Sequence, residues 1–392
     1  MDSRRGDGSS GRPPPKGEGF RLSAAELSGS FADLGTLLPL MLGGIAVAGL
    51  APGPVLGGFA IFYLGTAWHY RLPIPVQPMK AMAAVLLTAQ VSPAALAASG
   101  VIVGAILLIL GLTGWITRLA RLVPQSVLAG LQLGLGLALL RVSVGLMLSA
   151  PVVAGVTLAV LVAMLALRGA PATVVALAAA SATAWALGLP ATETGTPTAM
   201  LAMPPLPVPA EIEQALLVLT LPQLSLTFAN AIVLTSLLAD EYFGDRAAHV
   251  TPARLSITTG LANLVLAPFG ALPMCHGAGG LAAHHRFGAR SGMAPLVLGG
   301  LLLLLALLPG SWSLSALGAI PAAGLGVLLL AASTELALTR RLFDSKPSCW
   351  PVIAIAAALT LWKDPFWGMI AGGIAEAIRV AVIRLILARA RI

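Results

Sequence analysis

The chain has 392 residues, of which 58% are hydrophobic and only 10% are charged. Soluble domains carry about 25% charged residues, so this composition excludes an ordinary soluble domain. A formal net charge of +8 would suggest nucleic-acid binding in a soluble protein, but here basic cytoplasmic loops explain it, and no nucleic-acid partner is expected. The two cysteines, Cys275 and Cys349, provide neither a disulfide framework nor a four-cysteine zinc site, and no cofactor is expected.

Apolar stretches recur from Phe31 to Leu387 and have the length that an α-helix needs to cross a bilayer. We therefore predict an all-α polytopic membrane protein. Residues 1–22 are polar and rich in Arg, Pro and Gly, which predicts a disordered cytoplasmic N-terminal tail and no cleavable signal peptide. The first half then contains seven apolar segments, at 31–48, 53–70, 77–91, 93–111, 123–147, 151–168 and 172–187.

Residues 188–212 form a predicted extracytoplasmic linker, followed by a short amphipathic piece around Glu211–Leu221. A repeat with an odd number of spans has to place its second copy upside down. We therefore predict an inverted repeat, with its first copy at 23–187 and its second at 213–392. The seven segments of the second half are 222–240, 252–269, 275–288, 293–309, 317–339, 350–361 and 365–388.

The third segment of each half is broken in the same way. Leu72–Ala81 (LPIPVQPMKA) and Leu272–Leu281 (LPMCHGAGGL) share the dipeptide Pro-Met. Proline and glycine leave backbone groups without helical partners, which a membrane protein tolerates only where protein buries them or a watery cavity adjoins them. The apolar stretch after each break is too short to cross the bilayer, so each is predicted to be a half-helix that begins near the midplane. Paired broken segments indicate the central binding site of a transporter.

The basic residues predict the orientation in the membrane. With the N-terminus in the cytoplasm, all but three of the 23 Lys and Arg residues fall in the tail, in inner loops or at the inner end of the last span. Arg141 and Lys363 fall near the outer side, and Lys80 falls at mid-membrane. Basic residues concentrate in cytoplasmic loops, so both termini are predicted to be cytoplasmic.

The two half-helices aim their N-termini at one point, and a helix N-terminus offers an anion free N–H groups and about half a positive charge. Lys80 adds a full charge, although a lysine that snorkels to an interface is the simpler alternative. Gly277 and Gly279 let a ligand approach the backbone, and Cys275 is predicted to be a small packing residue. The predicted binding residues around the breaks are Gln77, Met79, Lys80, Ala81, Cys275, His276, Gly277, Ala278 and Gly279.

Polar residues elsewhere in the apolar segments extend the predicted site. Gln223, Thr227 and Asn230 recur at helical spacing on one face, where ordinary hydrogen bonding between membrane helices is the alternative. Asp33 is an isolated acid in the first span, and Glu335 is a further acid at membrane depth. An ionisable residue inside the membrane is a functional candidate by default.

Three residues are candidates for carrying a coupling proton: His276, Asp33 and Glu335. An unperturbed histidine has a pKa of about 6.5 and titrates near neutral pH. His276 is therefore the preferred proton-sensitive group, with a neutral packing histidine as the alternative. Asp33 is predicted to orient Lys80 or the neighbouring helices.

The strings Pro75–Ala81 (PVQPMKA) and Pro273–Ala282 (PMCHGAGGLA), continued by Arg286–Gly292 (RFGARSG), resemble the two signatures of the molybdate transporter family, which is related to the sulfate permeases. Ser28–Thr36 (SGSFADLGT) and Leu221–Thr227 (LPQLSLT) are similar to its first-span and eighth-span motifs. The resemblance implies a fourteen-helix inverted-repeat fold with a core domain (spans one to four and eight to eleven) and a gate domain (the remaining spans). It also implies a homodimer and elevator-like motion of the core. Since the chain ends directly after its last predicted span, no C-terminal soluble regulatory domain is expected.

We therefore predict a secondary active transporter that imports molybdate across a bacterial inner membrane. Moving a dianion inward costs about 4.6 kcal/mol per 100 mV, so coupling to more than two protons is expected. A sulfate transporter of the same fold is the closest alternative, because both anions are tetrahedral dianions, and an anion channel is a rival of another class. An enzyme is not expected, because no Ser/His/Asp or metal-ligand spacing occurs.

Overall fold

The computed structural model describes residues 20–46, 49–120, 124–167, 172–189, 203–308 and 318–389. Most of these residues are helical, and the β-structure among them consists of two strands of two residues each. The predicted tail lies outside this part of the chain up to residue 19, and so do residues 190–202 of the predicted linker.

The helices of the first half lie close to the predicted segments. Proline often occupies their first turn, where its missing N–H costs no hydrogen bond. At α5 the Ser92 hydroxyl also caps the helix by accepting a hydrogen bond from the Ala95 N–H. The helices are α1 (Ala24–Ser30), α2 (Leu34–Ala46), α3 (Pro52–Tyr70), α4 (Lys80–Thr88), α5 (Pro93–Thr113), α6 (Ile116–Ala120), α7 (Gln125–Leu148), α8 (Pro151–Ala166) and α9 (Ala172–Ala186).

The second half contains further apolar helices and several short 3-10 and π-helical segments, labelled η. They are α10 (Pro209–Gln214), η1 (Ala215–Thr220), α11 (Leu221–Leu226), η2 (Thr227–Leu234), α12 (Thr235–Phe243), η3 (Gly244–Ala247), α13 (Pro252–Leu266), η4 (Ala267–Phe269), α14 (Ala278–Arg286), α15 (Met293–Leu307), α17 (Ala322–Ala337), α18 (Arg340–Phe343), η5 (Pro347–Cys349), α19 (Trp350–Trp362) and α20 (Pro365–Arg389).

One predicted boundary is wrong. Instead of a loop, an amphipathic piece and a span that starts at residue 222, a single helical stretch runs from Pro209 to Ala247. Pro222 lies inside it, although proline removes one hydrogen bond and clashes with the preceding turn of an α-helix. The preceding turn is π-helical, and the Leu221 N–H donates to the Leu216 carbonyl, five residues back. This wider turn accommodates the proline without ending the helix.

Among the described residues, three helical stretches are long and apolar enough to cross a membrane: Pro93–Thr113, Gln125–Leu148 and Pro209–Ala247. Shorter apolar helices accompany them throughout the described part of the chain. The predicted all-helical polytopic class therefore agrees with the observed helices.

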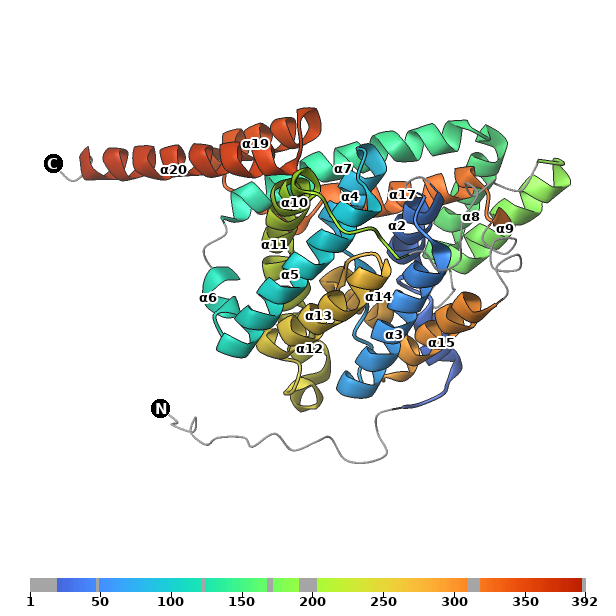
Figure 1. Cartoon of the computed structure of the whole chain (residues 1–392). Coiled ribbons are helices and arrows are strands. Elements are labelled where there is room, and N and C mark those ends of the chain that lie inside the picture. Colours follow the sequence, from blue (N-terminus) through green and yellow to red (C-terminus); the bar gives the residue numbers. More distant parts are fainter. Residues whose placement is uncertain are drawn as a thin grey trace.

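The helices pack in two groups (Figure 1). In the first, α3 packs on α15 and α5 packs on α13. In the second, α7 packs on α17 and α19, α19 packs on α20, and α8 packs on α9. Contacts of α2 with α17 and of α4 with α7 join the two groups. Helix α2 is thus positioned between them.

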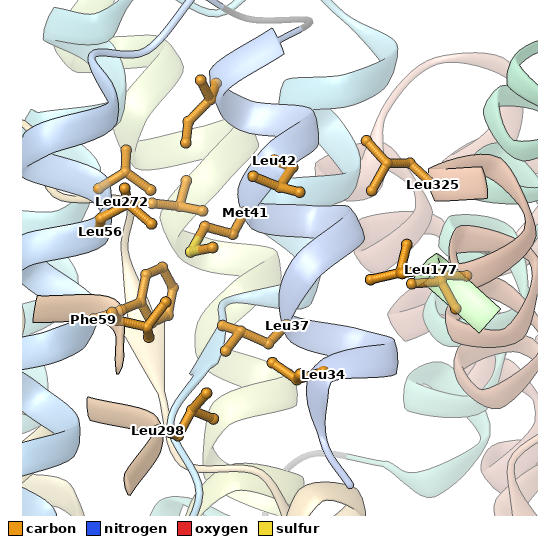
Figure 2. Packing of buried hydrophobic residues seen from close by; sticks show 14 of the residues in the cluster. Leu34, Leu37, Met41, Leu42, Leu56, Phe59, Leu177, Leu272, Leu298 and Leu325 are labelled. Atoms are coloured by element: carbon orange, nitrogen blue, oxygen red, sulfur yellow. The ribbon is translucent and has the colours of Figure 1, made fainter. Parts of the chain in front are cut away.

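Figure 2 shows how α2 is held on both sides. Leu37 and Met41 of α2 face Phe59 of α3 within one buried cluster. Leu177 and Leu325, from α9 and α17, lie on its other side in Figure 2 and belong to the same cluster. The start of α2, where Asp33 lies, is therefore fixed by apolar packing.

Glycines bring α5 and α13 into backbone contact. A β-carbon on Gly104 would lie 2.7 Å from the Leu264 nitrogen and 2.9 Å from the Gly260 carbonyl oxygen. Small residues at such a contact are the usual means of close packing between membrane helices. The contact fixes the position of α13, which in turn holds one of the broken segments.

Candidate functional site

The two broken segments pair with each other inside the bundle. β1 (Gln77–Pro78) and β2 (Met274–Cys275) form an antiparallel ladder in which Gln77 lies opposite Cys275. All four residues are buried. The ladder satisfies backbone groups that the prolines exclude from a helix. It also fixes the starts of α4 and α14, which follow the two strands, relative to each other.

Asn263 of α13 holds β2 from the other side. Its Nδ2 donates to the Met274 carbonyl at 2.6 Å, and the Met274 N–H donates to its Oδ1 at 2.9 Å. The side-chain amide thus pairs with the strand as a neighbouring strand would. The sequence prediction missed this residue, because one polar residue in an apolar segment is equally typical of ordinary interhelical hydrogen bonding.

The N-terminus of α14 has open N–H groups. Its N-cap, Gly277, is extended, and no described residue accepts a hydrogen bond from the N–H groups of residues 278–280. A β-carbon on Gly279 would collide with the Glu335 carboxylate, and one on Gly280 would lie 2.7 Å from Asp33 Oδ2. Two acidic side chains therefore lie against this N-terminus, the end of a helix that favours negative charge.

Lys80 balances one of these acids. Its Nζ lies 3.0 Å from Glu335 Oε1, and the Thr36 hydroxyl donates to Glu335 Oε2 at 3.3 Å. Gln77 Nε2 donates to Asp33 Oδ1 at 2.5 Å, whereas Asp33 Oδ2 is buried without a hydrogen-bond partner. The side chain of Lys80 is 13% exposed and that of Glu335 is 46% exposed. The ion pair thus joins a nearly buried lysine of α4 to a more accessible acid of α17.

The N-terminus of α4 is capped, unlike that of α14. Gln223 Oε1 accepts hydrogen bonds from the Ala81 and Met82 N–H groups at 2.9 and 3.3 Å. Gln223 Nε2 donates to the Thr227 hydroxyl at 2.9 Å. The predicted polar face of α11 and η2 therefore meets α4, but it uses two of the N–H groups that the prediction left for an anion.

A small cavity lies beside the ion pair, with about 20 Å³ available to the centres of water molecules, which is room for about one water. Gln132 of α7 is the polar lining residue that the sequence prediction missed, because it is one polar residue in a long apolar span. The lining residues are Gln77, Lys80, Gln132, Gln223, Leu226, Asn230, Ala231, Cys275, His276, Gly277 and Leu336.

His276 lines this cavity with a fully buried ring whose nitrogens are both hydrogen-bonded. Nδ1 lies 2.9 Å from the Pro75 carbonyl oxygen, so this nitrogen carries the proton and donates. Nε2 lies 3.0 Å from the hydroxyl of Thr258, which in turn lies 2.9 Å from the Tyr70 hydroxyl. This chain of hydrogen bonds connects the cavity wall to α3 and α13.

Five predicted binding residues do not line the cavity. Met79 and Ala81 are buried in apolar clusters, and Ala278 is buried at the start of α14. Thr227 is buried and bonded to Gln223. Gly279 lies next to Glu335, as described above, and the remaining predicted residues surround the cavity.

Crossed half-helices, open N–H groups and a membrane-depth lysine are features of a membrane transporter with a central site. The fold is similar to that of the transmembrane domain of a cyanobacterial bicarbonate transporter, BicA, with a TM-score of 0.63 and 19% identity over 89% of this chain and 96% of that chain. It is also similar to the murine Solute Carrier 26 family member A9 anion transporter in its inward-facing state, with a TM-score of 0.65 and 14% identity over 93% of this chain and 70% of that chain.

Sequence comparison gives the family. The family model for the molybdate transporter of the MFS superfamily matches residues 25–139 and 215–336, more than half of the chain. Molybdate transporter 1 of Arabidopsis thaliana is 29% identical over 90% of this chain and 87% of its own length. Molybdate transporter 2 of the same plant is 29% identical over 85% of this chain and 82% of its own length. The chain belongs to the molybdate transporter family, as the two signature motifs indicated, and it is a transporter and not an enzyme.

Proposed function

We propose that this protein imports molybdate by proton-coupled secondary active transport, and that the cavity beside Lys80 is the central binding site. The anion would lie between the Lys80 ammonium and the open N–H groups at the start of α14. A full charge and a helix N-terminus together form a site for an oxyanion. Gln77 and Gly277 would border it.

The observation that carries this proposal is the position of the Glu335 carboxylate. It accepts a hydrogen bond from Lys80 and lies against Gly279 at the N-terminus of α14. These are the contacts that an oxyanion substrate would make. An incoming dianion would therefore displace Glu335 from Lys80 and occupy its place.

Displacing Glu335 would supply the coupling. The bound dianion would place negative charge beside the Glu335 carboxylate, which favours the protonated form, so Glu335 would take up a proton when the anion binds. Asp33, which has one oxygen without a partner, would be a second acceptor. His276 stays a predicted third, although both nitrogens of its ring are already hydrogen-bonded. Each proton offsets one charge of the dianion during import.

The two helix groups of Figure 1 support the predicted core and gate domains. In this proposal α2, α4 and α14 belong to the core, and α7, α17, α19 and α20 belong to the gate, with the two halves of the chain related as an inverted repeat. The Lys80–Glu335 pair would then join core to gate, and elevator-like motion would break it. We further propose a homodimer in a bacterial inner membrane with both termini in the cytoplasm.

Uptake into proteoliposomes tests the function. We expect radiolabelled molybdate uptake to saturate, to require an inward proton gradient, and to be inhibited more strongly by unlabelled molybdate than by sulfate. Stronger inhibition by sulfate would make the protein a sulfate transporter, and uptake that does not saturate would make it a channel.

Lys80→Ala tests the site. Losing one of the charges that hold the dianion should weaken molybdate binding at least tenfold, since a charge-assisted hydrogen bond contributes about 1.5–3 kcal/mol. Equilibrium binding to the purified variant measures this, with Lys346→Ala, an exposed inner-loop lysine, as the matched control. If Lys80→Ala binds molybdate as tightly as the wild type, Lys80 is a lysine that snorkels to the interface and not a binding residue.

A further inference from the structure

A second and much larger cavity lies at the far end of α4. Its volume is about 480 Å³ on the same measure as the central cavity. Its wall combines the last turn of α4 with α7, η1 and the turn between α19 and α20. The lining residues are Val85, Leu87, Thr88, Ala89, Leu135, Ala138, Arg141, Val142, Val218, Thr360, Leu361, Trp362, Lys363, Asp364 and Pro365.

Two cations line this cavity, Arg141 and Lys363. Neither takes part in the two ion pairs of the described residues. Lys363 Nζ lies 4.8 Å from the centre of the Trp367 ring, a cation–π contact that leaves its charge in place. The side chain of Arg141 is exposed, and no hydrogen bond joins its guanidinium to any described residue.

The negative groups at the cavity do not cancel these charges. Asp364 is the one carboxylate in the wall, and its Oδ1 accepts hydrogen bonds from the Phe366 and Trp367 N–H groups at the start of α20. The C-terminal end of α4 contributes only about half a negative charge. Two full positive charges therefore face a single carboxylate that already caps a helix.

The predicted topology of the two cations indicates on which side of the membrane this cavity lies. Arg141 and Lys363 are the two basic residues that the topology prediction places near the outer side, and they meet in one cavity although Arg141 lies on α7 and Lys363 lies in the turn between α19 and α20. Beyond Arg141, α7 continues to Leu148, about 10 Å further along its axis. Arg141 therefore lies at membrane depth, where an ionisable residue is a functional candidate.

An apolar layer separates this cavity from the central site. Leu87 and Leu135 line the cavity and also belong to a buried cluster with Leu40, Leu139 and Leu329. Ala81, directly after Lys80, belongs to the same cluster. The cluster joins residues of α2 and α4 to residues of α7 and α17, so it closes the path along α4 between the two cavities.

We propose that the outer cavity is a second anion site, in which Arg141 and Lys363 bind an extracytoplasmic oxyanion dianion before it passes the apolar layer to the central site. A guanidinium offers paired N–H donors to an oxyanion, and lysine adds a mobile charge. Local positive charge in a cleft also raises the capture rate of a dilute anion, by about tenfold or more. The inference rests on the proposed import of molybdate, which defines the direction of transport.

Equilibrium binding of radiolabelled molybdate to the purified full-length protein at low ionic strength tests this site. We expect two bound anions per chain in the wild type, a tight one and a weaker one that is lost in high salt. Arg141→Gln/Lys363→Gln should lose the weaker one and keep the tight one. Lys80→Ala should lose the tight one and keep the weaker one. Arg118→Gln/Lys346→Gln, on the opposite side of the predicted membrane, should keep both.

Transport gives a second measurement. In vesicles that take up molybdate added to the outside, the KM of the Arg141→Gln/Lys363→Gln variant should be about tenfold higher than that of the wild type, with kcat unchanged. Arg141→Lys keeps the positive charge, so its KM should stay close to the wild-type value. A double variant that keeps two bound anions per chain and the wild-type KM would overturn the outer site. If Lys80→Ala nevertheless loses the tightly bound anion as expected, the proposed function stays intact. If Lys80→Ala keeps both anions while the double variant loses one, the central site fails instead.

Discussion

Glu335 contacts both Lys80 and the N-terminus of α14. It neutralises Lys80 at 3.0 Å, and it lies where the proposed substrate would lie. From the sequence, His276 is the preferred proton-sensitive group, because histidine titrates near neutral pH without any perturbation. The structure gives the two residues different surroundings. The His276 ring is fixed by the Pro75 carbonyl and the Thr258 hydroxyl, whereas the Glu335 side chain is 46% exposed.

Replacing Glu335 should therefore change both binding and coupling. Glu335→Gln removes the carboxylate that competes with the anion and also removes a proton acceptor. We expect molybdate to bind several-fold more tightly and its uptake to lose most of its dependence on external pH. Binding and proteoliposome uptake between about pH 5.5 and 7.5, a range that brackets the histidine reference value, measure the two effects.

Glu376→Gln is the matched control, because Glu376 also pairs with a cation, Arg379 at 2.6 Å on α20, away from the central cavity. His276→Gln is the comparison variant. A flattened pH profile in His276→Gln together with a normal profile in Glu335→Gln would assign the coupling to the histidine and contradict our assignment.

At the scale of elements, the site depends on how β2 is held. Asn263→Leu would leave the Met274 N–H and carbonyl without partners in a buried position, and an unsatisfied buried group costs about 1–3 kcal/mol. We expect a clear fall in the melting temperature and a loss of molybdate binding, both measurable by thermal unfolding with and without molybdate. Gln214→Leu, which changes an exposed amide bonded to the Gln90 carbonyl, should lower neither the melting temperature nor molybdate binding.

An Asn263→Leu variant with wild-type stability would mean that the β1–β2 ladder is stable without the hydrogen bonds of Asn263. Asn263→Asp is an informative intermediate, since it keeps the acceptor for the Met274 N–H, removes the donor to the carbonyl and adds a buried negative charge.

The same elements show how far the sequence predicts this structure. Pro78 and Pro273 locate both breaks, because a backbone without helical partners has few places in a membrane protein. The sequence also places Lys80 in the first turn of a half-helix, and α4 begins at this residue. It does not predict that Gln223 caps α4, because a side-chain amide finds its partner only through packing of distant segments.

The continuous helix through Pro222 was also not predictable. Proline normally ends an α-helix, and only the π-helical turn before it allows the helix to continue. The predicted seven-plus-seven count and its inverted symmetry stay predictions, although the family and the helical membrane class are confirmed.

At the scale of the whole molecule, the two helix groups meet again at Ser225 of α11 and Met369 of α20, where the hydroxyl lies 3.5 Å from the sulfur. If core moves against gate, a link at this point should stop transport. We expect Ser225→Cys/Met369→Cys, joined by a short bifunctional thiol-reactive crosslinker in a Cys349→Ser background, to lose molybdate uptake and to keep molybdate binding.

The control crosslink joins two helices of the same group, α7 and α20. Ser126 of α7 and Glu376 of α20 are hydrogen-bonded at 2.8 Å, so Ser126→Cys/Glu376→Cys should accept the same crosslinker and still transport. Equal transport by both crosslinked proteins would contradict a moving core.

Cys275 gives the central cavity a built-in chemical label. It is one of two cysteines in the chain, it is buried, and it forms part of the cavity wall beside Lys80. With Cys349 replaced, every thiol reagent that attaches to the protein must have reached Cys275 in the central cavity. The speed of that reaction, from either side of the membrane, then reports how often the cavity opens toward that side, and protection by molybdate reports how long the anion keeps it filled.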